Sequence, residues 1–207
     1  MAIKPSKRGQ AWAWRFHFGI REIERAYKAS RDASDKEVSG INEAAARHQA
    51  KVDAGEATWS EEDEDGNLVY DYGERLGEQM YDVEQVLALI RNAFVITLHH
   101  FVEQRVGAQL PKKKYDQTKG FSWLKGFGWT PMEGGLNQLR LAANCAKHSE
   151  GASASQLYAL RPDMFDEDMV KGWGAAPAYD TLKLTDAHVD EFFAAVQASV
   201  PKMGPAL

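Results

Sequence analysis

Apolar positions recur every three or four residues along most of this chain, which is the pattern of amphipathic helices. The longest such stretch runs from residue 74 to residue 106 and predicts one long helix. Between Ala93 and Leu98 this stretch is apolar nearly all round, which predicts that the helix crosses the middle of the core. Its regularly spaced apolar residues are Met80, Val83, Leu87, Ile90, Phe94, Leu98 and Phe101.

The same periodicity predicts shorter helices before and after the long one. The first of them is rich in aromatic residues in its N-terminal half, and the last is capped by Thr185 or Asp186. We therefore expect an all-α fold, a helical bundle of about six helices with one long central helix. The shorter predicted helices cover residues 10–30, 35–54, 134–151, 153–161 and 187–200.

An acidic segment lies between the second predicted helix and the long one. Eight acidic residues and no basic residue occur from Glu56 to Glu74, which predicts a solvated loop with a turn at Asp65-Gly66-Asn67. We expect one helical domain over residues 1–207. Within it, a helical extension covers 1–70 with the acidic loop at 56–74, and a helical core covers 75–200.

The composition of the chain limits the partners and the compartment that we expect for it. The chain has 207 residues, 44% of them apolar, and a formal net charge of −5, so the whole chain is not a basic nucleic-acid binder. Its single cysteine, Cys145, can form no intramolecular disulfide, which fits a reducing compartment. No apolar run approaches the roughly 20 residues of a membrane span, and no signal peptide is visible. We expect a cytoplasmic protein that does not bind membranes.

A local basic segment follows the long helix. Aromatic residues are interleaved with its lysines, and this composition is typical of surfaces that attract phosphates and stack bases. The segment is a candidate RNA-binding surface, and the alternative is a solvated loop that leads into a short core helix. The candidate RNA-binding residues are Lys112, Lys113, Lys114 and Lys119.

The predicted helix 134–151 carries a polar stripe. Asn137, Arg140, Asn144 and His148 fall within about 80° of one another around the helix axis. Arginine presents a planar fork that fits phosphate oxygens, and histidine can give or take a proton near neutral pH. Asn144 can orient either group. These roles suit metal-independent RNA cleavage, in which a base activates the 2′-hydroxyl and an acid protonates the leaving 5′-oxygen.

A second polar stripe runs along the long helix. Gln85, Asn92, His99 and Glu103 lie within about 40° of one another, and Glu103 is the carboxylate that could orient His99 or His148. Alternatively, the two stripes form a buried structural network, bind a ligand without chemistry, or hold a metal through His99, Glu103 and His148. The paired Glu-x-x-His motifs of di-iron bundles are missing, so we expect neither a metal nor a cofactor.

One segment of the sequence resembles a known family. The segment LRLAANCAKH, residues 139–148, resembles the C-terminal motif helix of the HEPN superfamily, which comprises small all-helical proteins. Many of these are RNase toxins or antiviral effectors that act as dimers. The resemblance covers roughly residues 78–165, including Arg161-Pro162 and Phe165. It departs in spacing, because seven residues separate Arg140 from His148 where the family has four to six.

The resemblance implies a HEPN-like fold and an endoribonuclease of toxin or phage-defence type that cleaves RNA at a dimer cleft. Arg140, Asn144 and His148 would be catalytic, with His99 and Glu103 orienting them. The implied partners are a second copy of the chain, RNA, and a cognate antitoxin or regulator. One arginine and one histidine supply only part of the required set, and two copies facing each other would supply all of it.

The alternative function is a non-catalytic helical interaction or regulatory protein of the same fold, which dimerises through the aromatic helix at 10–30. The two functions differ in one structural property. A nuclease needs Arg140 and His148 open to a basic cleft, whereas a structural network would seal them behind apolar side chains.

Overall fold

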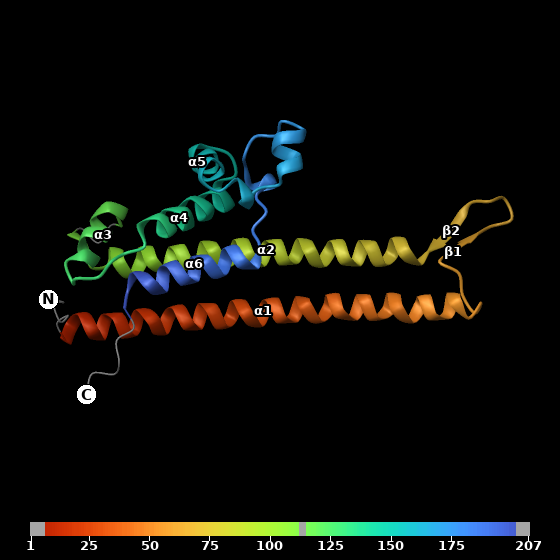
Figure 1. The fold of residues 1–207 in the computed structure, drawn as a ribbon, viewed down its shortest axis with the longest axis horizontal. Helices are drawn as coiled ribbons and strands as arrows, with labels where there is room; N and C mark the ends of the chain where they lie inside the picture. The colour runs from red at the N-terminus through yellow and green to blue at the C-terminus, as the bar shows by residue number, and fades with distance from the viewer. Residues whose placement is uncertain (1–6, 112–114, 202–207) are drawn as a thin grey trace. The chain divides into compact units, whose positions relative to one another are not determined.

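A computed structural model describes residues 7–111 and 115–201 of the chain (Figure 1). It confirms the prediction of a mostly helical fold, with one short β-hairpin added. The helices are α1 (Lys7–Asp53), α2 (Tyr72–Gly107), α3 (Gln117–Lys125), α4 (Glu133–His148), α5 (Ala152–Leu160) and α6 (Asp186–Ser199). The strands are β1 (Ser60–Glu62) and β2 (Leu68–Asp71), and short helical turns lie at η2 (Pro162–Met164), η3 (Asp168–Gly172) and η4 (Tyr179–Thr181).

The chain forms two compact units. Unit 1 contains residues 1–27 and 91–207, and unit 2 contains residues 28–90. Both boundaries fall inside long helices, one in α1 and one in α2, rather than near the acidic segment. All residues of the predicted RNA site that the structure describes belong to unit 1.

One long helix, α1, replaces the two helices predicted at 10–30 and 35–54. The expected break between them is absent because Arg31-Asp32-Ala33-Ser34 contains neither proline nor glycine, and Ser34 is buried rather than serving as a cap. Charged residues at these positions signal solvent exposure, and they do not interrupt the helical hydrogen bonds.

The long helix predicted at 74–106 is confirmed as α2. Its burial is one-sided, since Val95 and Leu98 are buried whereas Ala93 and Thr97 are exposed, so the helix lies at the edge of the core rather than across its middle. By length and composition α2 could also cross a membrane, but core helices of soluble proteins pass the same test. The segment includes Arg91, which pairs with Asp186 of α6 at 2.7 Å.

In unit 2, the acidic segment forms a hairpin instead of the predicted plain loop. Strands β1 and β2 pair antiparallel, and the predicted turn is present, with Gly66 at φ +81° and the Asp63 carboxylate accepting backbone N–H bonds from Asp65 and Asn67. The base of the hairpin packs on the helices of the same unit, where the His48 ring stacks on Tyr72 at 4.0 Å between centroids.

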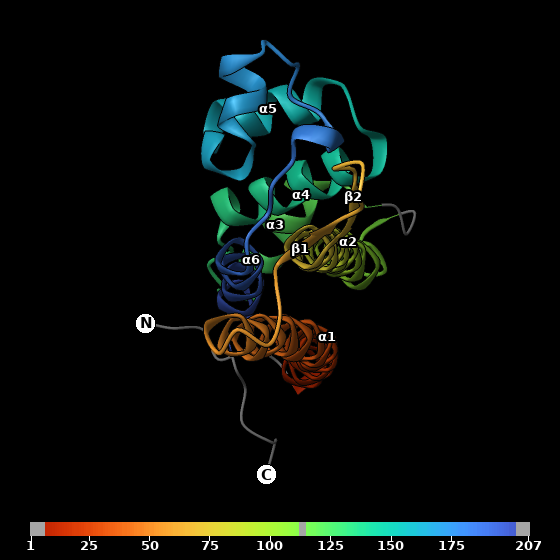
Figure 2. The ribbon, with the colours of Figure 1, turned by 90° about the vertical axis from the view of Figure 1, so that its right-hand side faces the viewer.

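In unit 1, α4 packs against both α5 and α6 (Figure 2). A Cβ atom at Gly135 would lie 2.6 Å from the Cβ of Ala195, so glycine permits the close approach of α4 to α6. Leu139 and Leu141 on α4 and Phe192 on α6 are almost completely buried. This packing determines which face of α4 is not covered by α5 and α6.

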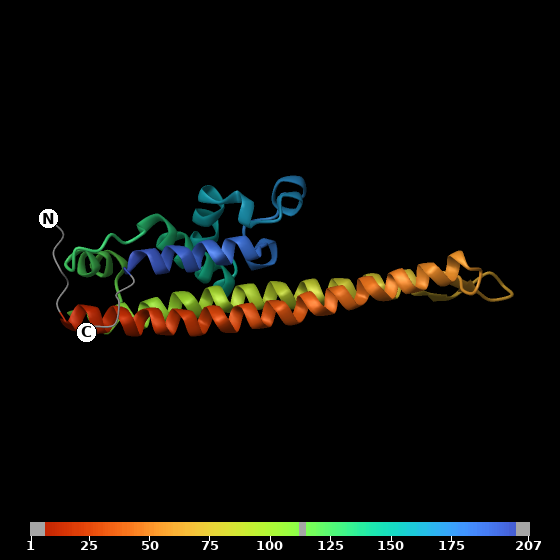
Figure 3. The ribbon, with the colours of Figure 1, turned by 60° about the horizontal axis from the view of Figure 1, so that its bottom comes forward.

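The helix α6 also lies beside the unit 1 parts of α1 and α2 (Figures 1 and 3). The Asp186 carboxylate at its N-terminus accepts hydrogen bonds from the Tyr27 hydroxyl at 2.6 Å and from Arg91 Nε at 2.7 Å. The predicted cap of this helix is confirmed, because the Thr185 hydroxyl accepts the N–H of His188. Three helices of unit 1 are thus joined at one carboxylate.

Candidate functional site

Arg140 is half-buried on α4 and is held by two side chains. Its Nε donates to Gln117 Oε1 at 3.0 Å, and its Nη2 donates to Asn137 Oδ1 at 2.9 Å. A guanidinium has five N–H donors, so three remain, and these have no hydrogen-bond partner among the described residues. The fork is therefore fixed in orientation while retaining donors for an anion.

His99 lies in the buried face of α2 and is 4% exposed. Its Nδ1 is 3.6 Å from Glu103 Oε2, and neither ring nitrogen has a hydrogen-bond partner in the described part of the chain. Burial lowers the pKa of His99 to about 4, Glu103 opposes this shift, and the positive charges of Lys147 and Arg140 add to it. His99 is consequently neutral at pH 7 and cannot serve as a general acid there.

Tyr115 joins the same group of side chains from the segment before α3. The pKa of Tyr115 is raised to about 12, mainly by burial and also by the Glu103 carboxylate, while Arg140 opposes the shift. Two glycines make room for Tyr115, since a Cβ atom at either Gly107 or Gly120 would lie 3.3 Å from it. At neutral pH the phenol is protonated and can act as a hydrogen-bond donor.

The electrostatic effects of these side chains on one another define a polar cluster in unit 1, with members from α2, α4 and the segment before α3. The cluster joins two cations on α4 to a neutral histidine, a carboxylate and a phenol. Most of its members are partly shielded from water, where charge interactions are stronger than at an open surface. The polar cluster consists of His99, Glu103, Tyr115, Arg140 and Lys147.

His148 lies outside this set of mutual interactions. It is the last residue of α4, it is exposed, and it has no hydrogen bond or ion pair with the described residues. Asn144 is half-buried on the same helix. Within the described residues, the charge of Arg140 thus affects the pKa of His99 and of Tyr115, whereas His148 is exposed at the end of the helix without a hydrogen bond or ion pair.

Two residues of the site, Lys147 and Gln117, are not among those predicted from the sequence. Lys147 is seven residues after Arg140 and only about 20° from it around the helix, whereas His148 is about 80° away. That angle was a usable signal for Lys147. Gln117 belongs to another helix and carries no motif, so only the fold could reveal that it holds Arg140.

The remaining predicted residues are placed as follows. Lys119 is exposed on α3, and its backbone N–H donates to the capping carboxylate of Asp116. Lys112, Lys113 and Lys114 lie outside the described residues. Asn92 is buried on α2, where its Oδ1 has no hydrogen-bond partner among residues 7–111 and 115–201, and Gln85 is exposed in unit 2.

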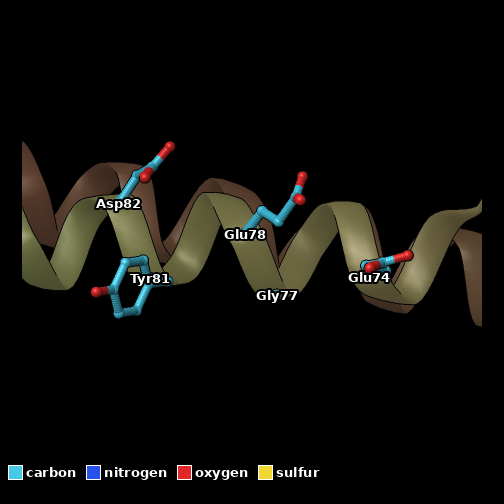
Figure 4. A pocket seen from close by; sticks show the side chains of 5 residues that line it. All are labelled: Glu74, Gly77, Glu78, Tyr81 and Asp82. Atoms are coloured by element: carbon cyan, nitrogen blue, oxygen red, sulfur yellow. The ribbon is translucent and has the colours of Figure 1, made fainter.

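The described residues give less support to a metal site, a thiol nucleophile or a separate pocket. They contain no group of three His, Cys, Asp or Glu side chains that could hold a metal. Burial raises the pKa of the Cys145 thiol to about 11, which makes it a poor nucleophile. An open depression on α2 in unit 2 is lined by Glu74, Gly77, Glu78, Tyr81 and Asp82, and it includes none of the predicted site residues (Figure 4).

Arg161, from the Arg161-Pro162 part of the resemblance, has a structural environment. Its guanidinium bonds both oxygens of Asp163 and also donates to Glu191 at 2.8 Å. Asp163 in turn bonds His188 Nε2 at 3.1 Å. The network ties the segment after α5 to α6, and the Arg161 hydrogen bond is the main reason that the pKa of Asp163 is lowered.

No protein-family model, no curated protein and no solved structure matches this chain. The resemblance to the HEPN superfamily therefore depends on the motif residues of this sequence alone.

Proposed function

We propose that this protein is a metal-independent endoribonuclease that acts as a homodimer and binds RNA at the polar cluster. The observation that carries the proposal is the Arg140 fork, which is held in place by Gln117 and Asn137 with three N–H donors to spare. Lys147 places a second cation on the same face of α4. Fixed cations beside partly buried polar groups suit a phosphate whose charge grows in a transition state.

In the proposed reaction the 2′-oxygen of one nucleotide attacks the adjacent phosphorus, and the bond from phosphorus to the 5′-oxygen breaks. A base removes the 2′-hydroxyl proton, and an acid protonates the leaving 5′-oxygen. The products are a 2′,3′-cyclic phosphate and a 5′-hydroxyl. His148 transfers one of these protons, and His148 of a second copy transfers the other. Asn144 orients the imidazole, and Lys119 attracts the RNA backbone.

In this proposal His99 and Glu103 take no part in proton transfer. Because its pKa is lowered to about 4, His99 is neutral at pH 7 and contributes a polar side chain to the cluster. Its 3.6 Å separation from Glu103 is longer than a hydrogen bond. Glu103 instead raises the pKa of Tyr115, and the positive charge of Arg140 opposes this effect.

A second candidate function is a non-catalytic interaction or regulatory protein. The observation that favours it is the burial of His99 and the engagement of Arg140 by two amides, which are also features of a structural polar network. In that case the protein cleaves no RNA, and loss of the Arg140 side chain lowers only the free energy of unfolding.

The test compares wild type with Arg140→Ala and Arg140→Lys on structured and unstructured RNA in EDTA. We expect cleavage to fall about 10- to 100-fold in Arg140→Ala, since one charge-assisted phosphate contact contributes about 1.5–3 kcal/mol. Arg140→Lys should retain part of the activity because it keeps the charge and loses the fork. Thermal unfolding separates a catalytic loss from a folding loss. Equal cleavage rates in all three proteins would contradict the assignment of Arg140.

A further inference from the structure

The formal charge of the chain is divided unequally between the two units. Unit 2 holds 16 acidic and 6 basic residues and has a net charge of −10, whereas unit 1 holds 14 acidic and 19 basic residues and has a net charge of +5. Opposite charges on separate units of one chain favour association between copies. Each unit also exposes large apolar side chains on a charged helix face.

In unit 1, the N-terminal part of α1 carries a basic–aromatic face, consisting of Trp14, Phe18, Arg21 and Arg25. These residues are spaced by four, three and four, so they lie within about 60° of one another. Trp14 is 50% exposed and Phe18 is 48% exposed, and their rings stack on each other at 5.9 Å. Arg21 lies 6.0 Å above the Phe18 ring. An exposed aromatic pair next to cations is typical of a protein contact.

In unit 2, the N-terminal part of α2 carries an acidic face, consisting of Glu74, Glu78, Tyr81, Asp82 and Leu89. Figure 4 shows the carboxylates of Glu78 and Asp82 pointing up from α2 and the Tyr81 ring pointing down, with Glu74 farther along the helix beyond Gly77. The three carboxylates make no ion pair with the described residues, and their i,i+4 spacing makes them repel one another. Tyr81 is 62% exposed and Leu89 is 58% exposed.

We propose that the basic–aromatic face of α1 binds the acidic face of α2 in a second copy of the chain. The two helices run antiparallel in this contact, with Arg25 opposite Glu74 and Arg21 opposite Glu78. Both ion pairs can form at once because the two arginines are four residues apart and the two glutamates are also four residues apart. The same register places Phe18 opposite Tyr81, so an aromatic contact continues the two ion pairs. A parallel arrangement that keeps two ion pairs, with Arg21 opposite Glu74 and Arg25 opposite Glu78, would instead place Phe18 opposite Asp71 and lose the contact with Tyr81.

Charge complementarity identifies the occupant as a second copy. The acidic face needs a helix that presents arginines four residues apart next to an aromatic residue, and α1 presents one. Within the part of the chain that the structure describes, Arg25 pairs only with the neighbouring Glu22 carboxylate at 3.0 Å, and Arg21 forms no ion pair. Exposed ion pairs contribute at most about 1 kcal/mol each, so we expect a weak, salt-sensitive association. The inference depends on none of the cleavage chemistry, and its test measures mass rather than activity.

The experiment is sedimentation velocity of the full chain over a concentration series at low and high salt. We expect wild type to associate at about 50 mM salt and to dissociate at about 500 mM, where the Debye length is short. Arg21→Glu/Arg25→Glu and Glu74→Arg/Glu78→Arg should each weaken association at least about tenfold, which is 1.4 kcal/mol. An equimolar mixture of the two variants should recover it, because the reversed charges match again.

The matched control is Glu61→Arg/Glu62→Arg, which reverses two exposed charges on β1 of the same unit and should leave association unchanged. Three results would overturn the proposal: wild type that stays monomeric throughout, variants that associate like wild type, or a mixture that associates no better than its separate components. Circular dichroism of each variant shows whether it keeps its helical content, so that weaker association is not mistaken for unfolding.

Discussion

His148→Ala is expected to reduce RNA cleavage by about 10²–10⁴-fold and to leave stability unchanged within about 0.5 kcal/mol. The two effects separate because His148 is exposed at the end of α4 and makes no hydrogen bond or ion pair with the described residues. If removing the His148 side chain abolishes cleavage and leaves stability unchanged, His148 acts on the substrate. If both histidines of a dimer take part, each variant homodimer loses the acid and the base together.

The measurement is single-turnover cleavage in EDTA, accompanied by urea unfolding of each protein. His148→Gln retains a polar side chain without a titrating group and should be as inactive as His148→Ala. His48→Ala is the control, because His48 belongs to unit 2 and should be dispensable for cleavage. Wild-type rates in His148→Ala would remove His148 from the mechanism.

Lowering the pH from about 7 to about 4 is expected to remove about 3 kcal/mol of stability through His99 alone. The folded pKa of His99 is lowered to about 4, whereas the ordinary value is 6.5. Between these two values the unfolded chain binds more protons than the folded chain, so stability rises with pH. The contribution is fully present above about pH 6.5 and is lost as the pH falls toward 4.

The test compares the pH dependence of the free energy of unfolding in wild type and His99→Asn. Carboxylates titrate in the same range in both proteins, so only the difference between the two slopes reports His99. The charged neighbours are Glu103, His100, Arg140 and Lys147, and the first opposes the shift while the others favour it. Parallel slopes would mean that His99 is not held neutral by burial. His99→Gln repeats the comparison if His99→Asn folds poorly.

Local patterns in the sequence predicted the helices well. The period of the apolar residues located α2, and Thr185 located the start of α6. The patterns were less informative where local signals are weak. Nothing in Arg31-Asp32-Ala33-Ser34 distinguishes a surface turn of a continuous helix from a break between two, and the hairpin at 60–71 has too few alternating apolar residues to predict strands.

The site was predicted only in part, for a geometric reason. Helical spacing can show which residues share a face of α4, but it cannot show what faces them. Arg140 was identified from its stripe, whereas Gln117 and Tyr115 reach the polar cluster from a segment more than 20 residues earlier. Sequence spacing also cannot report burial, and burial keeps His99, which was predicted as an orienting residue, neutral at pH 7.

The most direct test of the central claim is end-group analysis of RNA incubated with wild-type protein in EDTA, alongside DNA of the same sequence. Attack by the 2′-oxygen requires the 2′-hydroxyl and no metal. We predict RNA fragments with 2′,3′-cyclic phosphate and 5′-hydroxyl ends, and intact DNA. Intact RNA across all substrates and protein concentrations, or DNA cleaved as readily as RNA, would contradict the claim that this protein is a metal-independent endoribonuclease.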